Sequence, residues 1–453
     1  MKKNIYDGKK IIISGMARSG ISAAKLLKKF CADVTIQDAK DREKLKDEAE
    51  MLEKEGIKTY LGKNPDDIIA DFDILVMSPG VPCDLDFVKK AREAGVEVTG
   101  EIEVGYSVCE SPIIGITGTN GKTTTTALTG EIVKNYKEKS EVVGNIGTPF
   151  CDKADMTDKD SFIVAELSSF QLETIHNFRP VISAVLNITP DHLNRHKTIE
   201  NYIAAKERVF ENQTEEDYLI LNYDDDACRD MKNRTKARVF MFSRKEKVDG
   251  VYADEKSIYI NMLGINEKLV DIDDMNIIGT HNTENAMAAA AMALCAKVPV
   301  EIIRKTLKEF KAVEHRIEFV ETVNGVDYYN DSKGTNPDAA IKAIEAMKKP
   351  IVLIGGGYDK GSDFTQWIEK FEGKVKKLII IGAVTEKIEK TCDKLGFKDY
   401  ERAGSFEEAI DKCYAYAQSG DCVLLSPACA SWDMFESYEQ RGDIFKERVR
   451  NLR

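Results

Sequence analysis

Short apolar runs alternate with amphipathic stretches along the first hundred residues, a pattern typical of strands and helices around a parallel sheet. The apolar runs predict strands at Lys10–Ser14, Val34–Gln37 and Ile74–Met77. The stretches that follow them have helical spacing and predict helices at residues 19–30, 40–55 and 84–94. This order of elements predicts a small α/β unit with a parallel sheet.

The same alternation continues through two further segments. In the segment that begins at Ile113, the predicted strands are Phe162–Ala165, Val181–Leu186, Tyr218–Leu221 and Val239–Phe242. Residues 247–280 have the pattern of short antiparallel strands, and a strongly apolar helix, Ala286–Ala296, follows them. In the segment that begins near Val313, the predicted strands are Val326–Asn330, Ile351–Ile354, Leu378–Ile381 and Cys422–Leu425.

Composition and charge narrow the class of protein. The chain has 453 residues, enough for several domains, and its net charge of −12 argues against non-specific binding to nucleic acid. No run of 18 apolar residues predicts a membrane span, and the first residues lack the apolar run of a signal peptide. The ten cysteines form no C-x-x-C pair, which favours reduced thiols and a cytoplasmic location.

The stretch Gly115-Ile-Thr-Gly-Thr-Asn-Gly-Lys-Thr-Thr124 has the construction of a nucleotide phosphate cradle, because an apolar strand leads into it and a helical pattern follows. Glycines let successive N–H groups point at one anion, and the helix N-terminus adds partial positive charge. Lys122 can reach the outer phosphates, and the Thr123 hydroxyl can bind Mg²⁺. Ile116 stands where the usual pattern has glycine, so the loop is a variant; a glycine-rich turn without a ligand is the alternative.

A second glycine-rich turn, Ser14-Gly-Met-Ala-Arg-Ser-Gly20, follows the first predicted strand. It has the spacing of a dinucleotide-binding turn, with Ala17 at the middle glycine position. Asp38 follows the second strand, where such folds place a ribose-binding acid, and Ser78-Pro-Gly80 ends a later strand. These residues predict a pocket for a nucleotide diphosphate. A tight turn is the alternative, and Ala17 and Arg18 argue against an ordinary NAD site.

Polar residues also follow two predicted strands of the middle segment. Glu166 comes directly after Phe162–Ala165, where a carboxylate beside a phosphate loop can hold Mg²⁺. The next strand leads into a segment that contains His192 and His196, two of only five histidines. A solvated glutamate and structural histidines are the alternatives. Lys206 lies on the following helix, and the sequence alone does not distinguish it from a solvated charge.

The alanine-rich helix opens with Gly279-Thr-His-Asn-Thr-Glu-Asn285. Its two asparagines, Asn282 and Asn285, are three residues apart and therefore share one face of the helix. An asparagine there can pair with an adenine edge or cap the helix, and the sequence does not decide between the two.

Three polar or glycine-rich loops of the last segment each follow a predicted strand: Asn330-Asp-Ser-Lys-Gly-Thr335, Gly355-Gly-Gly-Tyr-Asp-Lys360 and Ser426-Pro-Ala-Cys-Ala-Ser431. Because the carboxyl ends of parallel strands meet at one edge of a sheet, the loops together predict a cleft. Arg316 and Lys360 are candidate clamps for a carboxylate or a phosphate. Unrelated turns are the alternative.

Together, these motifs resemble the Mur ligase family, the ATP-dependent amino-acid ligases of bacterial peptidoglycan synthesis. The resemblance extends over the whole chain and rests on Thr117-Gly-Thr-Asn-Gly-Lys-Thr123, Gly144-Asn-Ile-Gly147, Asp331-Ser-Lys-Gly-Thr-Asn336, Leu425–Ser431 and Tyr438-Glu-Gln-Arg-Gly442. It implies an α/β protein of three domains. These are a Rossmann-like UDP-sugar-binding domain at residues 1–108, a P-loop ATPase-like domain at residues 109–313, and a Rossmann-like amino-acid-binding domain at residues 314–453.

The resemblance also implies roles for individual residues. It implies a catalytic role for Lys122, His192, Lys206 and Arg316. The residues implied in ATP binding are Gly118, Thr119, Asn120, Gly121, Lys122, Thr123, Thr124, Asn282, Asn285, Arg316 and Asp331. Two Mg²⁺ ions are expected, with ligands among Thr123, Glu166, His192 and Lys206, the lysine as its carbamate. The UDP-sugar residues are Arg18, Ser19, Asp38, Ser78, Gly80 and Asn145, and the D-glutamate residues are Thr335, Lys360, Ser431 and Tyr438.

The implied reaction joins the carboxylate of UDP-N-acetylmuramoyl-L-alanine to the amine of D-glutamate through an acyl phosphate, with release of ADP. A monomer is expected, with closure of the last domain over ATP. Tyr438 and Trp432 depart from the phenylalanine and the smaller aliphatic residue that the resemblance leads us to expect. A sister ligase for another amino acid, a folylpolyglutamate synthetase and a nucleotide switch are the alternatives. The Ser426–Ser431 signature argues against a sister ligase, and the N-terminal α/β unit argues against a folylpolyglutamate synthetase. The presence of three loop-bearing units argues against a nucleotide switch.

Overall fold

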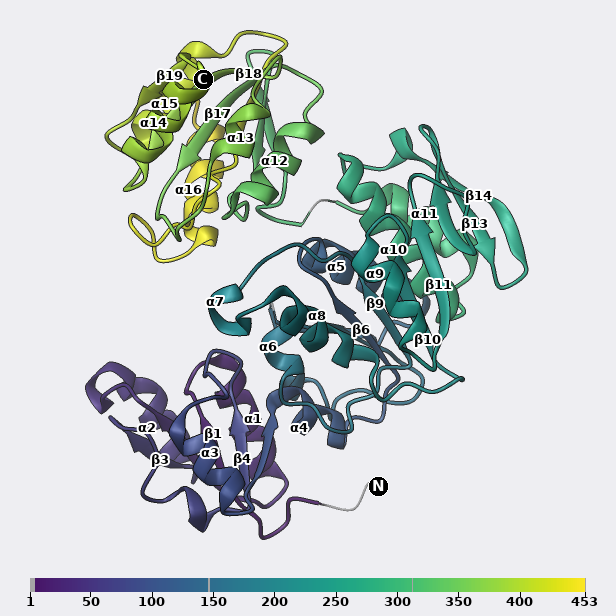
Figure 1. Ribbon diagram of the computed structural model, residues 1–453, viewed down its shortest axis with the longest axis vertical. Coiled ribbons are helices and arrows are strands. Elements are labelled where there is room, and N and C mark those ends of the chain that lie inside the picture. Colours follow the sequence, from purple (N-terminus) through teal and green to yellow (C-terminus); the bar gives the residue numbers. More distant parts are fainter. Residues whose placement is uncertain (1–4, 146, 312, 453) are drawn as a thin grey trace. The chain divides into compact units, whose positions relative to one another are not determined.

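The computed structural model describes residues 5–145, 147–311 and 313–452. The chain forms two compact units. Unit 1 comprises the chain up to Ile272 together with Glu284–Lys308, and unit 2 comprises Asp273–Thr283 and the chain from Glu309 onward. Within the described ranges the strands form three sheets, two in unit 1 and one in unit 2, with helices packed against them (Figure 1).

The first sheet of unit 1 is parallel throughout, in the order β3-β2-β1-β4-β5. Its strands are β1 (Lys10–Ser14), β2 (Asp33–Asp38), β3 (Lys58–Leu61), β4 (Ile74–Met77) and β5 (Glu97–Gly100). Its helices are α1 (Arg18–Lys29), α2 (Lys46–Lys54), α3 (Asp86–Glu93) and α4 (Glu101–Val108). Because side chains alternate along a strand, Ile11 and Ile13 pack into the core on one face and Ile12 into the core on the other.

The second sheet of unit 1 has the order β14-β13-β12-β11-β10-β9-β6-β8-β7. Its strands are β6 (Ile113–Thr117), β7 (Glu141–Gly144), β8 (Ile163–Glu166), β9 (Ile182–Val185), β10 (Tyr218–Asn222), β11 (Arg238–Ser243), β12 (Gly250–Ala253), β13 (Ser257–Met262) and β14 (Ile265–Asp271). The strands from β7 to β12 pair in parallel, and β12, β13 and β14 pair antiparallel, as predicted for residues 247–280.

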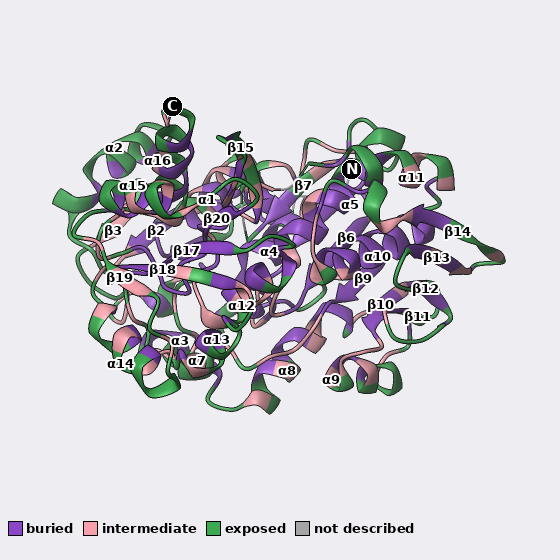
Figure 2. Cartoon of the chain, turned by 90° about the horizontal axis from the view of Figure 1, so that it is seen from above, coloured by how far each residue is buried: buried purple, intermediate pink, exposed green. Residues whose placement is uncertain are grey.

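The helices that accompany this sheet lie between or after its strands along the chain. They are α5 (Lys122–Tyr136), α6 (Ser169–Leu172), α7 (Leu193–His196), α8 (Ile199–Glu207), α9 (Asp226–Asp230), α10 (Thr280–Cys295) and α11 (Val300–Glu309). The inner strands β6 and β9 and the alanine-rich part of α10 are buried (Figure 2). Helix α10 begins at Thr280, six residues before the predicted start, because Gly279 with φ of 95° lets the chain turn into the helix there.

The sheet of unit 2 has the order β15-β16-β20-β17-β18-β19. Its strands are β15 (Glu318–Val323), β16 (Val326–Asn330), β17 (Ile351–Gly356), β18 (Val375–Ile381), β19 (Tyr400–Arg402) and β20 (Cys422–Leu425), and only the β15–β16 pair is antiparallel. Its helices are α12 (Pro337–Ala346), α13 (Thr365–Glu369), α14 (Thr385–Leu395), α15 (Phe406–Tyr416) and α16 (Tyr438–Arg450). Separate apolar cores lie on its two faces.

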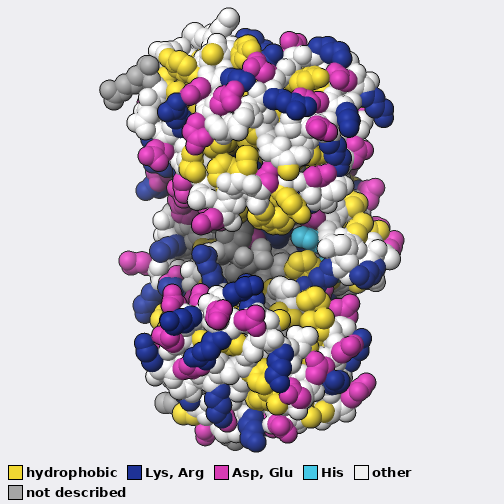
Figure 3. Space-filling view, turned by 90° about the vertical axis from the view of Figure 1, so that its left-hand side faces the viewer, with side chains coloured by type: hydrophobic (Ala, Val, Ile, Leu, Met, Phe, Trp, Pro, Cys, Tyr) yellow, Lys and Arg dark blue, Asp and Glu magenta, His cyan; other side chains and the backbone are white. Residues whose placement is uncertain are grey.

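These sheets confirm the predicted α/β fold class with parallel-rich sheets. In the described part of the chain, no helix combines the length and apolar character needed to cross a bilayer. On the face shown in Figure 3, Lys and Arg side chains are interspersed with Asp and Glu side chains, so the charges of that face are mixed in sign.

Candidate active site

The predicted phosphate loop connects β6 to α5 and leaves no room for side chains at two of its glycines. Gly118 has φ of 146°, and a Cβ there would lie 3.0 Å from the Leu186 Cβ. Gly121 has φ of 83° and precedes the first residue of α5; a Cβ there would collide with the Asn285 side chain. Backbone N–H groups at the start of a helix can therefore approach an anion closely at this loop.

Two lysines that are far apart in the chain meet at the Gly118 carbonyl. The Lys122 Nζ donates to the Gly118 oxygen at 3.0 Å and to the Thr119 oxygen at 2.8 Å. The Lys206 Nζ, from α8, donates to the same Gly118 oxygen at 2.8 Å. Lys206 is only 1% exposed, and burial together with the nearby Lys122 charge lowers its pKa well below the ordinary lysine value.

The loop is held by residues that the sequence analysis did not single out. The Asn187 side chain accepts from the Asn120 N–H at 2.8 Å and donates to the Asn120 carbonyl at 3.0 Å. The Thr119 hydroxyl lies 3.2 Å from the Tyr202 hydroxyl, and burial raises the pKa of Tyr202 to about 12. Asn187 lies in the segment that follows β9, so the signal that could have found it is its place after a strand next to β6.

The predicted metal ligands lie in α5, at the end of β8, directly before α7 and in α8, and they do not form a complete cage among the described residues. Glu166 ends β8, is 2% exposed and accepts from the Asn145 side-chain amide at 3.1 Å. His192 has φ of 53° and directly precedes α7 as its N-cap residue, with its ring edge-on to Phe170 at 4.9 Å. Among the described residues, no three His, Cys, Asp or Glu side chains gather closely enough to hold a metal ion. Thr123 lies in the first turn of α5 and is buried.

The two predicted adenine-binding asparagines are both buried in the first turns of α10. The Asn282 side-chain amide donates to the Ile278 carbonyl at 2.8 Å, and the Asn285 Oδ1 accepts from the Thr125 hydroxyl at 3.1 Å. The first of these bonds is made to the preceding chain, and the second joins α10 to α5.

The N-terminal turn is built as a dinucleotide-type turn. A Cβ at Gly20 would collide with the Gly15 carbonyl, so α1 packs directly on the turn. Ala17 has φ of −92°, a backbone conformation open to any L-residue, which explains why alanine is accepted at the middle position. The Asp38 carboxylate accepts from the Met16 N–H at 2.9 Å, and the Ser78 hydroxyl donates to the Gly15 carbonyl at 3.0 Å.

The remaining predicted UDP-sugar residues lie at or near strand ends of unit 1. In the first turn of α1, Arg18 is exposed and Ser19 is half-buried, and Gly80 is exposed in the turn after β4. Asn145 follows β7. Asp38, Ser78, α1 and the Gly15 turn thus lie together, while Asn145 is bonded to Glu166 of the second sheet.

The three polar loops of unit 2 follow neighbouring strands, because β20 lies between β16 and β17. Backbone bonds join them directly. The Asp331 N–H donates to the Leu425 carbonyl at 2.7 Å, the Gly356 N–H to the Pro427 carbonyl at 2.8 Å, and the Tyr358 N–H to the Ala430 carbonyl at 2.9 Å. The loops therefore form one cluster at the carboxyl edge of the sheet.

Asp331 and Arg316 belong to this cluster. The buried Asp331 carboxylate accepts from the Ser426 hydroxyl at 2.7 Å. Burial raises the pKa of Asp331 to about 7, although the Ser426 hydrogen bond and the nearby Arg316 charge act in the opposite direction. The Arg316 Nε is a buried donor with no hydrogen-bond partner among the described residues, which leaves it able to bind a further acceptor.

The four predicted D-glutamate residues lie on these loops or directly after them. Ser431 is 2% exposed, and the Lys360 ammonium lies 5.9 Å from the centre of the Trp432 ring. The Tyr438 ring is edge-on to His315 at 6.0 Å, and its carbonyl accepts from the Ser332 hydroxyl at 2.8 Å. Thr335 ends the loop after β16.

Arg441 is a residue of unit 2 that the sequence analysis quoted without a role. It is fully buried on α16 and joins two of the loops, because its Nε and Nη2 donate to Ser332 at 2.9 and 2.7 Å and its guanidinium lies 3.4 Å from the Cys429 carbonyl. Burial lowers its pKa to about 10, which still leaves it charged at neutral pH. The sequence does not reveal that this arginine is fully buried.

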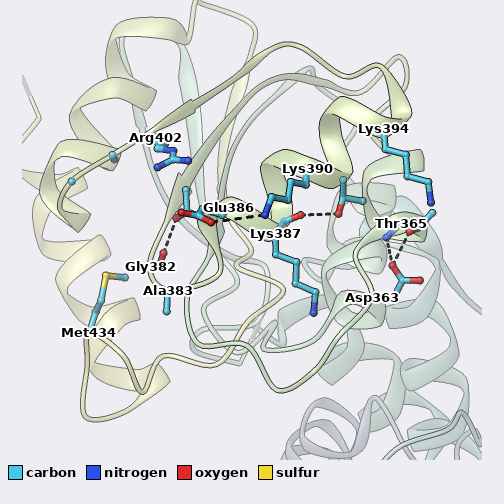
Figure 4. Close-up of a pocket in the computed structure, with 14 residues that line it drawn as sticks. Asp363, Thr365, Gly382, Ala383, Glu386, Lys387, Lys390, Lys394, Arg402 and Met434 are labelled. Atoms are coloured by element: carbon cyan, nitrogen blue, oxygen red, sulfur yellow. Dashed lines mark hydrogen bonds and ion pairs between the residues drawn. The ribbon is translucent and has the colours of Figure 1, made fainter.

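A hollow of about 1000 Å³ in unit 2 lies beside these loops, and none of the predicted site residues lines it (Figure 4). Two of its cations have close acidic partners, Lys387 with Asp359 at 2.8 Å and Arg402 with Glu389. Near the start of α14, at the edge of this hollow, the Asp433 carboxylate already accepts a hydrogen bond from the Ala383 N–H at 2.9 Å. The hollow is a surface of solvated ion pairs.

Family models match most of the chain. A model described as "Mur ligase MurD-like, N-terminal domain" matches residues 9–100, "Mur ligase middle domain" matches residues 116–293, and "Mur ligase, glutamate ligase domain" matches residues 315–429.

Curated relatives match over nearly their whole length. The chain is 52% identical to UDP-N-acetylmuramoylalanine–D-glutamate ligase of Thermoanaerobacter sp. (strain X514), over 98% of this chain and 99% of the relative. It is 50% identical to the ligase of the same name from Lachnospira eligens and 48% identical to that from Clostridioides difficile, over the same shares of the two chains.

Solved structures of more distant ligases have the same fold. UDP-N-acetylmuramate-alanine ligase MurC from Thermotoga maritima superposes with a TM-score of 0.63 at 18% identity, over 98% of this chain and 99% of the other. The pseudomurein peptide ligase type C from Methanothermus fervidus gives 0.61 at 20% identity, over 98% and 100%. The phosphate loop, the joined loops of unit 2, the family models and the near full-length relatives agree, and the chain belongs to the Mur ligase family.

Proposed function

We propose that this protein is an ATP-dependent ligase that joins D-glutamate to UDP-N-acetylmuramoyl-L-alanine, in the cytoplasm and as a monomer, during synthesis of peptidoglycan precursors. The acceptor and the amino acid are those in the names of relatives up to 52% identical over almost the whole chain. The observation that carries the nucleotide chemistry is the convergence of Lys122 and Lys206 on the Gly118 carbonyl of a loop that has no room for a side chain at two of its glycines.

The chemistry requires activation of a carboxylate. A carboxylate resists attack by an amine because its charge is delocalised and its leaving group is poor. Transfer of the ATP γ-phosphoryl group forms a P–O bond to the carboxylate and breaks the β–γ bridge, which releases ADP. The deprotonated amine then forms the C–N bond, and the acyl C–O bond breaks with loss of phosphate. Phosphoryl transfer depends mainly on positioning and charge neutralisation.

The ATP site is proposed on residues whose surroundings suit it. Backbone N–H groups of Gly118–Thr124 bind the phosphates, and Lys122 exchanges its two loop carbonyls for phosphate oxygens. Asn282 and Asn285 bind the adenine, and Asp331 binds the ribose. Arg316 neutralises phosphate charge during transfer, a role that suits its buried Nε, which has no hydrogen-bond partner in the described part of the chain.

Mg²⁺ is proposed at the strand ends beside this loop. The residues that would hold two ions are Thr123, Glu166, His192 and Lys206 as its carbamate, and the buried Glu166 carboxylate and Thr123 hydroxyl fit hard cations. Bound Mg²⁺ supplies positive charge to the transferring phosphoryl group. Carbamate formation needs the neutral amine, and the lowered pKa of Lys206 favours that form.

The two other substrates are assigned to the two Rossmann-like sheets. The turns that hold Arg18, Ser19, Asp38, Ser78 and Gly80, together with Asn145, would bind the UDP-sugar. Thr335, Lys360, Ser431 and Tyr438 would bind D-glutamate. Lys360 suits a carboxylate, because its ammonium is an exposed cation beside the joined loops of unit 2.

The direct test measures ADP formation by the purified protein. Rapid release of ADP is expected only when ATP, Mg²⁺, UDP-N-acetylmuramoyl-L-alanine and D-glutamate are all present. Lys122→Ala should remove this activity while circular dichroism stays unchanged, and Lys134→Ala, an exposed lysine on the same helix, should keep it. Hydrolysis of ATP that needs neither acceptor nor amino acid would contradict the proposal and favour a nucleotide switch.

A further inference from the structure

Arg195, on α7, joins the parts of unit 1 that carry its two sheets. The proposed mechanism gives this residue no role. Its Nη1 donates to the Pro79 carbonyl at 2.8 Å, and its Nη2 lies 3.4 Å from the Val81 carbonyl. On the other side, Nη2 donates to the Glu173 carboxylate at 2.6 Å. Its side chain is only 16% exposed, so this arrangement is largely sheltered from solvent.

The carbonyls that Arg195 binds belong to the turn after β4. This turn contains Ser78 and Gly80, which are proposed to bind the UDP-sugar, and Ser78 ties it to the Gly15 turn. Arg195 itself lies three residues after His192, in the short helix α7 that His192 precedes. One guanidinium therefore fixes the sugar-binding turn relative to the segment that carries a proposed metal ligand.

A continuous stack of side chains extends from Arg195 to the phosphate loop. The guanidinium lies 4.2 Å from the centre of the Phe170 ring, which stacks on His196 at 5.5 Å. The His196 ring lies 5.2 Å from Tyr202, and the Lys206 ammonium lies 4.6 Å from the centre of the Tyr202 ring. The Tyr202 hydroxyl meets Thr119 of the phosphate loop. Because these side chains are closely packed, a displacement of the sugar-binding turn would shift them and would reach the phosphate loop.

The surroundings explain why an arginine is needed here. Its planar fork binds two carbonyls and a carboxylate at once while its face covers a ring, and a lysine ammonium cannot reproduce that geometry. The turn and α6 pack against each other, with Pro79, Val81, Phe170 and Arg195 among the residues at their contact. Without the guanidinium, the Pro79 and Val81 carbonyls would lose the donors that tie the turn to α7.

We propose that Arg195 is a positioning residue that sets the UDP-sugar-binding turn relative to the His192 segment, so that a bound UDP-sugar presents its carboxylate to the phosphate loop. The proposal rests on the function proposed above. In this role Arg195 acts by holding the Pro79 and Val81 carbonyls, and it does not contact the reacting atoms.

The test compares two arginines that bind backbone carbonyls. Arg208 donates to the Leu172, Glu173 and Ile175 carbonyls at 2.8, 2.6 and 2.6 Å, all within the second sheet's part of unit 1, so Arg208→Lys is a matched control. Calorimetry measures the affinity for UDP-N-acetylmuramoyl-L-alanine without ATP. Loss of two carbonyl bonds in Arg195→Lys should weaken this affinity about tenfold. Arg208→Lys should lower the unfolding midpoint and change the affinity less than about twofold.

Kinetics provide the second readout. Arg195→Lys should raise the KM for the UDP-sugar about tenfold and leave the KM for ATP nearly unchanged, which a general loss of folding would not do. An unchanged affinity in Arg195→Lys, or an equal loss in Arg208→Lys, would overturn the proposal. Because calorimetry needs no turnover, a protein that binds the UDP-sugar but forms no product would contradict the ligase function alone, whereas a protein that does not bind it would contradict both.

Discussion

Glu101 is a buried carboxyl group at the first residue of α4, and its surroundings make the stability of the protein depend on pH. It is 2% exposed, its Oε1 accepts from the Cys151 N–H at 2.7 Å, and its Oε2 has no hydrogen-bond partner among the described residues. Burial raises its pKa to about 7, against an ordinary value of 4.5. The folded state therefore holds a proton that the unfolded chain has already released.

The free energy of unfolding should consequently fall as the pH rises from about 4.5 to about 7, and this loss should level off above the folded-state pKa. Its size for this group is about 3 kcal/mol. Glu101→Gln should remove the contribution, so the variant should be more stable than the wild type at pH 8 and of similar stability near pH 4.5. Urea unfolding at a series of pH values measures the difference.

Glu103 provides the contrast on the same helix. Its carboxylate accepts backbone N–H groups of His176, Asn177 and Phe178 at 2.8 to 3.0 Å. Glu103→Gln should therefore destabilise the protein at pH 8 by about 1–3 kcal/mol, the opposite sign to Glu101→Gln. Equal pH profiles for Glu101→Gln and the wild type would contradict the account of Glu101.

Residues of the candidate site differ in how far the sequence reveals them. The phosphate loop is visible because its glycines and lysine follow an apolar strand in an order that few other structures use. Lys206 is visible only through the family resemblance, because its burial comes from α8 packing against a loop 88 residues away. Glu101 and Arg195 carry no local pattern, since their partners lie in distant segments of the chain, and Asn187 is marked only by its place after a strand.

At the scale of elements, the apolar runs predicted the inner strands and missed most of the edges. The strands without a prediction are β3, β5, β7, β15 and β19, and each lies at an edge of its sheet. An edge strand has one row of unpaired backbone groups and often a solvated face, so it needs no continuous apolar run. The half-exposed β3 and β19 illustrate this.

The phosphate loop can be tested as an element by filling its tightest position. Gly121→Ala should abolish ATP-dependent ADP formation, because the new methyl group would collide with Asn285 and push α10 from α5. Gly396→Ala is the matched control, since Gly396 has a similar φ of 79° but nothing within 4 Å of a Cβ. The control should lose about 1 kcal/mol of stability through backbone strain and keep its activity.

Thermal unfolding of both variants measures the loss of stability from backbone strain. ADP release measures the loss of activity from the collision at residue 121. If Gly121→Ala retained normal activity with the same loss of stability as Gly396→Ala, the loop would not be a close-fitting phosphate cradle.

At the scale of the whole molecule, the predicted boundary at residues 108 and 109 and that at residues 313 and 314 remain predictions. Unit 1 holds both of the first two sheets, and one apolar core contains Ile11 and Ile13 of β1 together with Ile163 and Ala165 of the second sheet. This shared core is a long-range property of packing. Local sequence patterns detect the turns between segments but not the area that the segments bury against each other.

The proposed ATP residues are divided between the units, with Lys122 in unit 1 and Arg316 and Asp331 in unit 2. We therefore expect the units to close on ATP when all substrates bind. Small-angle scattering should give a smaller radius of gyration with a non-hydrolysable ATP analogue, UDP-N-acetylmuramoyl-L-alanine and D-glutamate than without them. Superimposable scattering curves in the two conditions would count against closure.

The most direct test of the account is the rate of ADP formation with UDP-N-acetylmuramoyl-L-alanine across a panel of D- and L-amino acids. The account predicts rapid ADP release with D-glutamate and near-background rates with L-glutamate, L-alanine and diamino acids. A faster rate with any of these, or equal rates in the absence of an amino acid, would contradict it.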